Sequence, residues 1–250
     1  MKVGVKIHHY ERCTSTNDVA REMALKGTDE GVVVMAEEQT EGRGTKGRSW
    51  DSAKGQGLYL SIILRPPAEA ADFLPLMTGV AVREALAAAT GLDVGLKWPN
   101  DLIASGKKLG GVLCESFWSG QSLDFAVVGV GLNLLQDSAD FPLAVRPRAT
   151  SVRLEMGRLP KTEELLDHLF ARLDFWYGLL RRGKRENILK EFEKRMVLPA
   201  SRKMTVLYSG GKFKGFYRGL QADGGLMLEA DGLTKGFAAA EIMELIYEEG

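Results

Sequence analysis

The most constraining feature of this sequence is residues 39–50, a glycine-rich and basic stretch that leads into a strand pattern and not into a helix. Its glycines match G-x-G-x-x-G, but a dinucleotide-binding loop also needs a helix that opens at the loop and an acidic residue about 20 positions on. The stretch also resembles a P-loop, with Arg48 where lysine is required and again no helix. The apolar run 58–64 instead predicts a buried strand, so neither nucleotide-binding fold is favoured.

The chemistry of this stretch is that of an anion-binding loop. We expect its glycines to take positive φ angles and to turn their N–H groups toward one anion, while basic side chains add full charges around it. The glycines are Gly42, Gly44 and Gly47, and the basic residues are Arg43, Lys46 and Arg48. Taken alone, the segment is equally compatible with a solvated basic surface loop.

Polar residues also collect at the ends of other expected elements. Residues 15–17, Ser-Thr-Asn, precede a helical pattern, where either hydroxyl could simply cap the helix. At 97–101 a proline ends a strand and presents a polar turn. The second arm of the next hairpin begins at Lys108, a position where a lysine is usually just solvated. Glycines within the apolar strand 125–133 usually indicate that a ligand or another backbone comes close.

The pattern of strands and helices predicts an α+β fold with two domains. Residues 1–198 are expected to form a catalytic domain with a mixed β-sheet flanked by helices, and 199–250 a small SH3-like β-barrel. Helices are expected at 17–26, 74–89 and 162–180, and the apolar stripe of the last one is core. Short strands separated by glycine-rich turns are expected at 204–208, 212–220, 225–229 and 234–238.

Composition favours a cytoplasmic enzyme. The chain has 33 basic and 33 acidic side chains, so no overall charge attracts it to DNA or to an anionic membrane. No apolar run reaches the roughly 18 residues of a membrane span, and the N-terminus is not a signal peptide. Cys13 and Cys114 are compatible with free thiols in a reducing compartment, and the three histidines lack metal-ligand spacing.

In chain order, these segments resemble the biotin protein ligases, which join biotin to a lysine of a carrier protein through biotinyl-adenylate. The resemblance covers essentially the whole chain. It rests on Ser15-Thr16-Asn17, on Glu38-Gln39 with Gly42-Arg43-Gly44 and Gly47-Arg48-x-Trp50, on Lys97-Trp98-Pro99-Asn100-Asp101, on Lys108-Leu109-x-Gly111, and on Gly129-x-Gly131-x-Asn133. Each motif is weak singly, but together in this order they are specific.

The resemblance implies ATP-dependent activation of biotin with Mg²⁺, followed by transfer to a biotin carrier domain of acetyl-CoA carboxylase or a related biotin-dependent enzyme. It implies the catalytic residues Lys108, Arg43, Arg48 and Asp101, where Asp101 either holds magnesium or orients the acceptor lysine. Ser15, Thr16 and Gln39 suit the ureido ring, Arg43 the carboxylate and phosphate, Trp50 the adenine and Asn133 the base edge. The other residues expected at the ligands are Asn17, Gly42, Gly44, Thr45, Lys46, Lys97, Asn100, Gly111 and Gly131.

Two features separate this chain from relatives in the family. Thr45 stands where the usual loop carries a further arginine, so we expect looser retention of the adenylate. Only fourteen residues precede Ser15, so we expect no winged-helix DNA-binding domain and no DNA binding. A homodimer is compatible with the family, but nothing in the sequence identifies an interface. Two alternatives remain, a lipoate ligase or octanoyltransferase, and a non-catalytic biotin sensor or adaptor.

Overall fold

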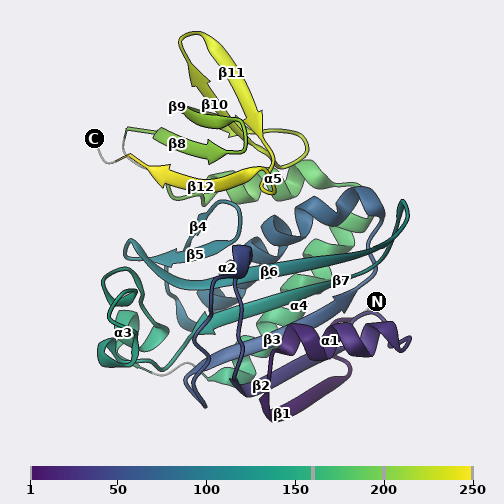
Figure 1. The fold of residues 1–250 in the computed structure, drawn as a ribbon. Coiled ribbons are helices and arrows are strands. Elements are labelled where there is room, and N and C mark those ends of the chain that lie inside the picture. The colour runs from purple at the N-terminus through teal and green to yellow at the C-terminus, as the bar shows by residue number, and fades with distance from the viewer. Residues whose placement is uncertain (1, 159–160, 199–200, 249–250) are drawn as a thin grey trace.

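Two β-sheets organise the part of the chain that the computed structural model describes, residues 2–158, 161–198 and 201–248 (Figure 1). The larger sheet has the order β1-β2-β3-β7-β6-β5-β4. Its first two strands are parallel and the remaining neighbours are antiparallel, so the sheet is mixed, as predicted. The strands are β1 (Ile7–Cys13), β2 (Val33–Gln39), β3 (Gly57–Leu64), β4 (Gly95–Lys97), β5 (Asp101–Ala104), β6 (Lys107–Ser119) and β7 (Ser122–Asn133).

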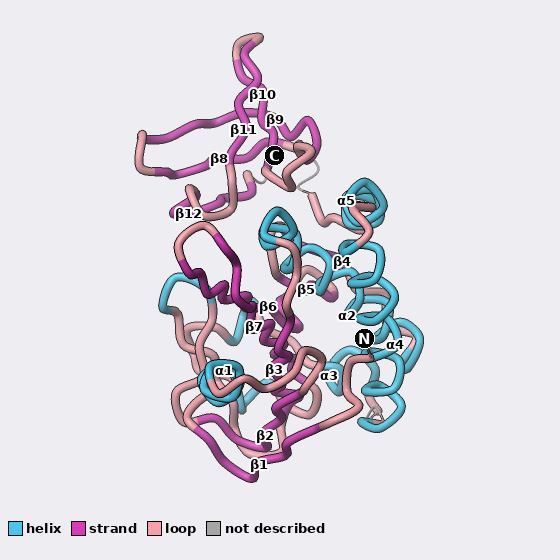
Figure 2. The backbone as a smooth tube through the Cα atoms, turned by 90° about the vertical axis from the view of Figure 1, so that its right-hand side faces the viewer, coloured by secondary structure: helices cyan, strands magenta, loops and turns pink. Residues whose placement is uncertain are grey.

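Helices cover both faces of this sheet. Figure 2 shows α2 (Leu74–Thr90), α4 (Thr162–Arg181) and α5 (Arg185–Lys194) on one side of the strands, and α1 (Thr16–Leu25) on the other. A short helix, α3 (Val152–Met156), follows the sheet. The three helices expected from the apolar periodicity begin and end within one residue of the predicted bounds.

Burial on both faces explains the unbroken apolar run in β3. Leu60 and Ile62 belong to the main core, which also contains the buried side chains of α2 and α4. Ile63 points the other way, into a smaller cluster with Ala20 and Ala24 of α1. Successive side chains of a strand alternate between faces, so a strand covered on both sides is apolar throughout.

The second sheet has the order β11-β10-β9-β8-β12 and is antiparallel, which is compatible with the expected SH3-like barrel. Its strands are β8 (Lys203–Tyr208), β9 (Gly211–Leu220), β10 (Leu226–Ala230), β11 (Leu233–Phe237) and β12 (Ile242–Tyr247). Four of them correspond to predicted strands, whereas β12 was not predicted. The expected domain boundary at 198/199 adjoins residues 199–200, which lie outside the described residues, so this division stays a prediction.

One helical stretch, Ala68–Thr90, is long and apolar enough to cross a membrane, although the sequence predicted no such run. In the fold, 67% of its apolar window is buried. Its helix α2 packs against α4, and Val80, Ala81 and Val82 have no exposed surface. A core helix of a soluble domain passes the same length and composition test, and the burial favours that interpretation.

The Trp98 indole connects the two sheets. Its Nε1 donates a buried hydrogen bond of 3.0 Å to the carbonyl oxygen of Gly224, which precedes β10. Trp98→Phe should lower the free energy of unfolding by about 1–3 kcal/mol, because the Gly224 carbonyl loses its buried partner. Denaturant unfolding measures the change. Trp118→Phe is the control, because Trp118 is 49% exposed, and an equal loss in both variants would contradict the assignment.

Candidate functional site

Most of the predicted site residues gather on the face of the larger sheet that carries α1. The segment that follows β2 contacts α1 on this face, where Arg43 binds Asp18. Two glycines of β7 face the same segments: a side chain at Gly129 would meet Asn17 of α1, and one at Gly131 would lie 2.7 Å from the Trp50 indole. The glycines were expected to admit a ligand or another backbone. They instead admit side chains of this chain.

A network of hydroxyl and amide groups lies where α1 begins. The Gln39 side-chain oxygen accepts from the Thr16 backbone N–H at 2.8 Å and from the Thr16 hydroxyl at 3.1 Å. The Ser61 hydroxyl lies 2.7 Å from the Thr16 hydroxyl and 2.6 Å from the Asn17 side-chain oxygen. These residues make three contacts between oxygen atoms, but the Thr16 and Ser61 hydroxyls supply only two hydrogens. One of the three oxygen pairs therefore has no hydrogen between its atoms. The network can therefore accept a donor from a ligand.

Ser15 occupies the N-cap position of α1 without acting as a cap. Its backbone is extended, with φ −153° and ψ 137°, but its side chain makes no capping hydrogen bond. The residue is only 3% exposed. Ser hydroxyls at this position usually accept from the N2 or N3 amide. Ser15 therefore has the backbone position of a cap. Because its hydroxyl does not bond to the helix, that hydroxyl stays free for another partner.

Three residues that sequence analysis did not single out hold the predicted ones in place. Asp18 binds Arg43 through two hydrogen bonds, of 2.8 and 2.7 Å, to its outer nitrogens. Glu115 accepts from the Asn17 amide at 2.6 Å, and Ser61 completes the network described above. Asp18 directly follows the Ser-Thr-Asn motif, and this proximity could have identified it as a site residue. The other two lie in apolar strand patterns.

The Asp18–Arg43 pair has a clear electrostatic consequence. The hydrogen bond from Arg43 is the main reason that the pKa of the Asp18 carboxyl lies below its ordinary value, and burial partly opposes it. A bidentate pair of this kind fixes the plane of the guanidinium as well as its position. Arg43 is thus oriented before any ligand is present.

The glycine-rich loop differs from the expected anion cradle. Of its three glycines only Gly47 has a positive φ, of 69°, whereas Gly44 has a φ of −110° and Lys46 takes the left-handed conformation at 60°. The Gly44 N–H bonds to the Arg48 carbonyl at 2.7 Å, so it does not point at a ligand. At Gly42, a side chain would collide with the Trp50 carbonyl. In this fold only Gly42 is required for close backbone packing, whereas Gly47 allows the positive φ of the turn and Gly44 has room for a side chain.

The remaining basic residues form a second group around Asp101. The Lys108 ammonium lies 2.6 Å from the Asp101 carboxylate and 5.5 Å from the centroid of the Trp50 ring. The pKa of Lys97 is lowered, mainly by burial and then by the neighbouring charges of Lys108 and Arg48, against the opposing effect of Asp101. Lys97 therefore lies within the electrostatic reach of all three residues.

Lys46 and the predicted asparagines already have partners. The Lys46 ammonium donates to the backbone carbonyl of Met243 in β12 at 3.0 Å. Asn133 donates to the Thr150 carbonyl at 3.0 Å and accepts from Gln136 at 3.3 Å, which leaves one hydrogen and one lone pair of its amide. Asn100 donates to the Val112 carbonyl at 2.8 Å, a contact that ties the turn to β6.

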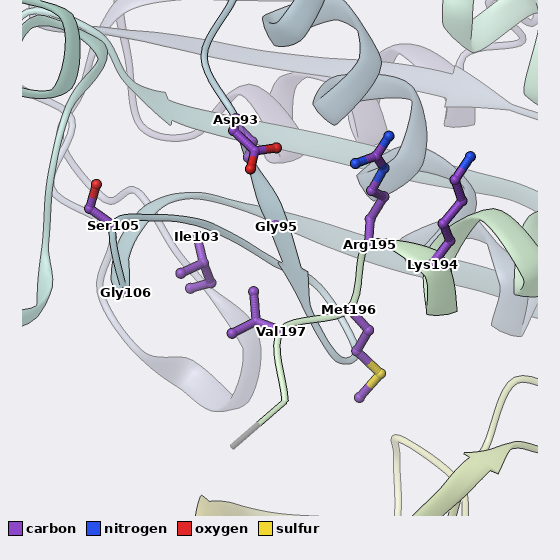
Figure 3. Close-up of a pocket in the computed structure, with 10 residues that line it drawn as sticks. Asp93, Gly95, Ile103, Ser105, Gly106, Lys194, Arg195, Met196 and Val197 are labelled. Carbon is purple, nitrogen blue, oxygen red and sulfur yellow. The ribbon is translucent and has the colours of Figure 1, made fainter. Parts of the chain in front are cut away.

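A separate cavity of about 320 Å³ lies where β4 and β5 meet the chain after α5 (Figure 3). Its lining includes Asp93, Ser105 and Arg195, and none of the predicted site residues. Within the described residues there is no cluster of three or more His, Cys, Asp or Glu side chains that could hold a metal ion. Because its lining contains none of the predicted residues, this cavity is not part of the predicted site.

Comparison with known proteins identifies the relatives of this chain. A family model described as the biotin/lipoate A/B protein ligase family matches residues 10–133. A biotin–[acetyl-CoA-carboxylase] ligase from Mycobacterium tuberculosis is 34% identical over 243 residues, which cover 92% of this chain and 86% of that protein. The bifunctional ligase/repressor BirA of Bacillus spizizenii is 31% identical over 241 residues, which cover 95% of this chain and 74% of that protein.

A solved structure extends the likeness to both sheets. The biotin protein ligase from Aquifex aeolicus in complex with biotin and ATP matches with a TM-score of 0.83 at 28% identity. The match covers 98% of this chain and 100% of that chain. The expected α+β fold is thereby confirmed, and the matched part of the chain includes the C-terminal sheet.

The Asp18–Arg43 pair can be tested without a ligand. Asp18→Asn should speed tryptic cleavage within 43–48 about 1.4- to 5-fold, the ratio equivalent to the roughly 0.2–1 kcal/mol of a partly exposed ion pair. Because the pKa of Asp18 is lowered, its contribution is present above the ordinary carboxyl pKa and is lost as the pH falls through the folded-state pKa, so trypsin at neutral pH reports it fully.

Arg21→Gln is the control for this measurement. Arg21 lies 4.0 Å from the same Asp18 carboxylate but does not contact the loop, so its loss should leave the cleavage rate unchanged. Equal cleavage rates in the wild-type protein and in Asp18→Asn would show that the pair does not order the loop.

Proposed function

This chain belongs to the biotin protein ligases of the biotin/lipoate A/B protein ligase family, and from this premise we propose that it activates biotin with ATP and transfers it to a lysine of a biotin carrier domain. The observation that carries the proposal is that two groups of side chains, the neutral one around Gln39 and the basic one around Asp101, are connected by direct contacts. Trp50 connects them: its carbonyl accepts from Ser52, which accepts from Gln39, and its ring faces Lys108. A neutral polar group of side chains is thus joined to a basic group.

In the proposed first step, a carboxylate oxygen of biotin attacks the α-phosphorus of ATP. A new P–O bond forms, the bond to the β-phosphate oxygen breaks, and pyrophosphate leaves with the bonding electrons. The protein has little covalent chemistry to perform, because catalysis requires two anions to be brought together and their charge to be stabilised by fixed donors. Arg43, Lys108 and Arg48 are the groups that we assign to this task.

The neutral end of the pocket suits the ureido ring of biotin. That ring donates and accepts hydrogen bonds, and the side chains of Ser15, Thr16 and Gln39 include groups of both kinds. Burying these groups against an acid without a ureido ring would leave them unpaired, at a cost of about 1–3 kcal/mol each. We therefore propose biotin over lipoate or octanoate as the substrate.

Arg43 is held in a way that suits the carboxylate of biotin. Asp18 binds the outer nitrogens of the guanidinium, and the remaining N–H groups stay available. Trp50 is proposed to cover the adenine, and the free hydrogen and lone pair of Asn133 to meet its base edge. Gly111 lies beside Lys108, and a side chain there would be in van der Waals contact with the Lys108 stem at 3.4 Å.

Magnesium is proposed to enter the site together with ATP. The described residues offer no cluster of carboxylates for a resident ion, and one Asp101 oxygen is paired with Lys108 at 2.6 Å. Mg²⁺ commonly binds through substrate phosphates with one or two carboxylates, so Asp101 stays a predicted ligand within an ATP complex only. The ion would neutralise phosphate charge there.

In the proposed second step, the amine of the acceptor lysine attacks the acyl carbon of the adenylate. The C–N bond forms, the bond to the phosphate oxygen breaks, and AMP leaves, while the amine proton passes to solvent or to a nearby carboxylate. Asp101 is the candidate for orienting that amine. The acceptor is proposed to be the carrier domain of acetyl-CoA carboxylase or a related enzyme, and the cytoplasm to be the site of action.

The direct test is ATP-dependent transfer of labelled biotin to a purified biotin carrier domain, with pyrophosphate release followed in parallel. Biotin should support release, whereas lipoate and octanoate should not. Release with lipoate alone would favour the lipoate ligase alternative. Binding of biotin without consumption of ATP would favour the sensor.

Lys108→Ala should lower the rate of biotin-dependent pyrophosphate exchange by about 100-fold or more, if the ammonium acts mainly in the transition state. Lys107→Ala is a matched control, because Lys107 is the adjacent lysine and its side chain is exposed. Thermal unfolding checks that both variants fold. Unchanged exchange in Lys108→Ala would remove this residue from the mechanism.

Thr45→Arg should slow the dissociation of biotinyl-adenylate, because it adds a cation beside an anionic ligand in a loop that holds three basic residues. We expect a change of about 3- to 10-fold, in the range of one partly desolvated ion pair. The dissociation rate of the labelled adenylate measures it. Ser49→Arg adds the same charge at an exposed position of the loop and should change the rate little; equal effects would indicate a general charge effect.

A further inference from the structure

The C-terminal sheet contributes a strand to the basic group around Asp101. Figure 1 shows β12 as the strand of the C-terminal sheet that faces the larger sheet. The Met243 carbonyl of this strand accepts from Lys46 at 3.0 Å, and the ring of Tyr247 lies 4.4 Å from the ammonium of Lys97. β12 therefore contacts both the loop and the β4 end of the proposed nucleotide site.

Tyr247 is held there without a partner for its hydroxyl. The phenol oxygen is buried and makes no hydrogen bond within the described residues. Its pKa is raised above the ordinary tyrosine value, mainly by burial and then by the charge of Asp101. A buried, unpaired hydroxyl is unfavourable, and such groups in native proteins call for an explanation. The hydroxyl thus does not account for the position of Tyr247. The contact of its ring with the Lys97 ammonium is the remaining explanation.

The ring faces a cation with few other partners. Lys97 makes no salt bridge within residues 2–158, 161–198 and 201–248, and the nearby Asp101 carboxylate is paired with Lys108. Lys108 and Arg48 both repel the Lys97 ammonium. The face of an aromatic ring attracts a cation, and the attraction grows as water is excluded. The Tyr247 ring is therefore a direct contact that stabilises this ammonium, in addition to the attraction of the Asp101 charge.

We propose that Tyr247 is a positioning residue that holds the ammonium of Lys97 toward the polyphosphate of the nucleotide, so that the C-terminal sheet completes the anion site of the larger one. This inference rests on the proposed function for the identity of the ligand. The ring keeps Lys97 in place against two neighbouring like charges, and Lys97 makes the contact with the phosphates. The role belongs to the ring and not to the hydroxyl.

The test is calorimetric titration of ATP and of inorganic pyrophosphate into variants of the whole chain, together with pyrophosphate-release kinetics. Tyr247→Leu should weaken ATP binding about 3- to 30-fold, the range of a partly desolvated cation–π contact. The KM for ATP should rise by the same factor, whereas kcat and the KM for biotin should change less than twofold. A general disturbance of the sheet would instead change all of these values.

Two further variants separate the ring from the hydroxyl and from Lys97. Tyr247→Phe keeps the ring and should recover the affinity for ATP. Lys97→Ala should weaken binding on its own, and Tyr247→Leu added to it should cause no further loss, because residues that act through one contact are not additive. Phe216→Leu is the control: it removes a similar contact, with Lys203 at 5.5 Å, in the same sheet and should change nothing.

Three results would overturn the inference: ATP binding unchanged in Tyr247→Leu, independent losses from Tyr247→Leu and Lys97→Ala, or a loss in Tyr247→Phe as large as that in Tyr247→Leu. A wild-type chain that binds ATP but releases no pyrophosphate with biotin would contradict the proposed function instead. Calorimetry would still decide the role of Tyr247 in that case, because it needs no turnover.

Discussion

The site depends on two places in β7 where the sheet carries no side chains. At Gly129 and Gly131 the strand surface is bare, and Asn17 and Trp50 lie directly on it. Without this close approach, α1 and the loop after β2 would be held away from the sheet. Once they are in contact, Asn17 reaches Glu115 on the neighbouring strand, 98 positions away in the sequence. Tertiary packing at two glycines thus brings distant motifs into one site.

Periodicity in the sequence predicted most of the fold because its core elements are strongly patterned. The helices α1, α2 and α4 have apolar stripes, and β3 is apolar throughout because both of its faces are covered. Strand β12 was missed for a physical reason. Its side chains are mostly exposed or half-buried, and its pairing with β8 contains an irregularity, so the period-two signal of a half-buried strand is weak.

The predicted site was less complete, because the motifs indicate which residues are expected to carry the chemistry but not which residues hold them in place. Asp18 and Glu115 act through partners 25 and 98 positions away, and no local pattern encodes such a pairing. The loop glycines were assigned positive φ angles because glycine permits them. In the fold, the backbone pairs Arg43 with Ser49, and the turn between them takes positive φ angles at Lys46 and Gly47, so only one of the three glycines has the expected conformation.

The basic residues of the site differ in how their charges are balanced before a ligand arrives. Two are paired with carboxylates, Arg43 with Asp18 and Lys108 with Asp101. Lys46 and Lys97 instead contact neutral groups of the C-terminal sheet, and the charges of Glu244 and Asp101 attract them without forming a salt bridge within the described residues. Under the proposed function, we expect a polyphosphate to be attracted first by these two cations, because the charge of a directly paired cation is largely cancelled at a distance. The paired cations are instead fixed in position, which suits groups that act on the reacting atoms once the anion is in place. A division between attraction and positioning therefore follows from the choice of partners, and the C-terminal sheet supplies the neutral ones.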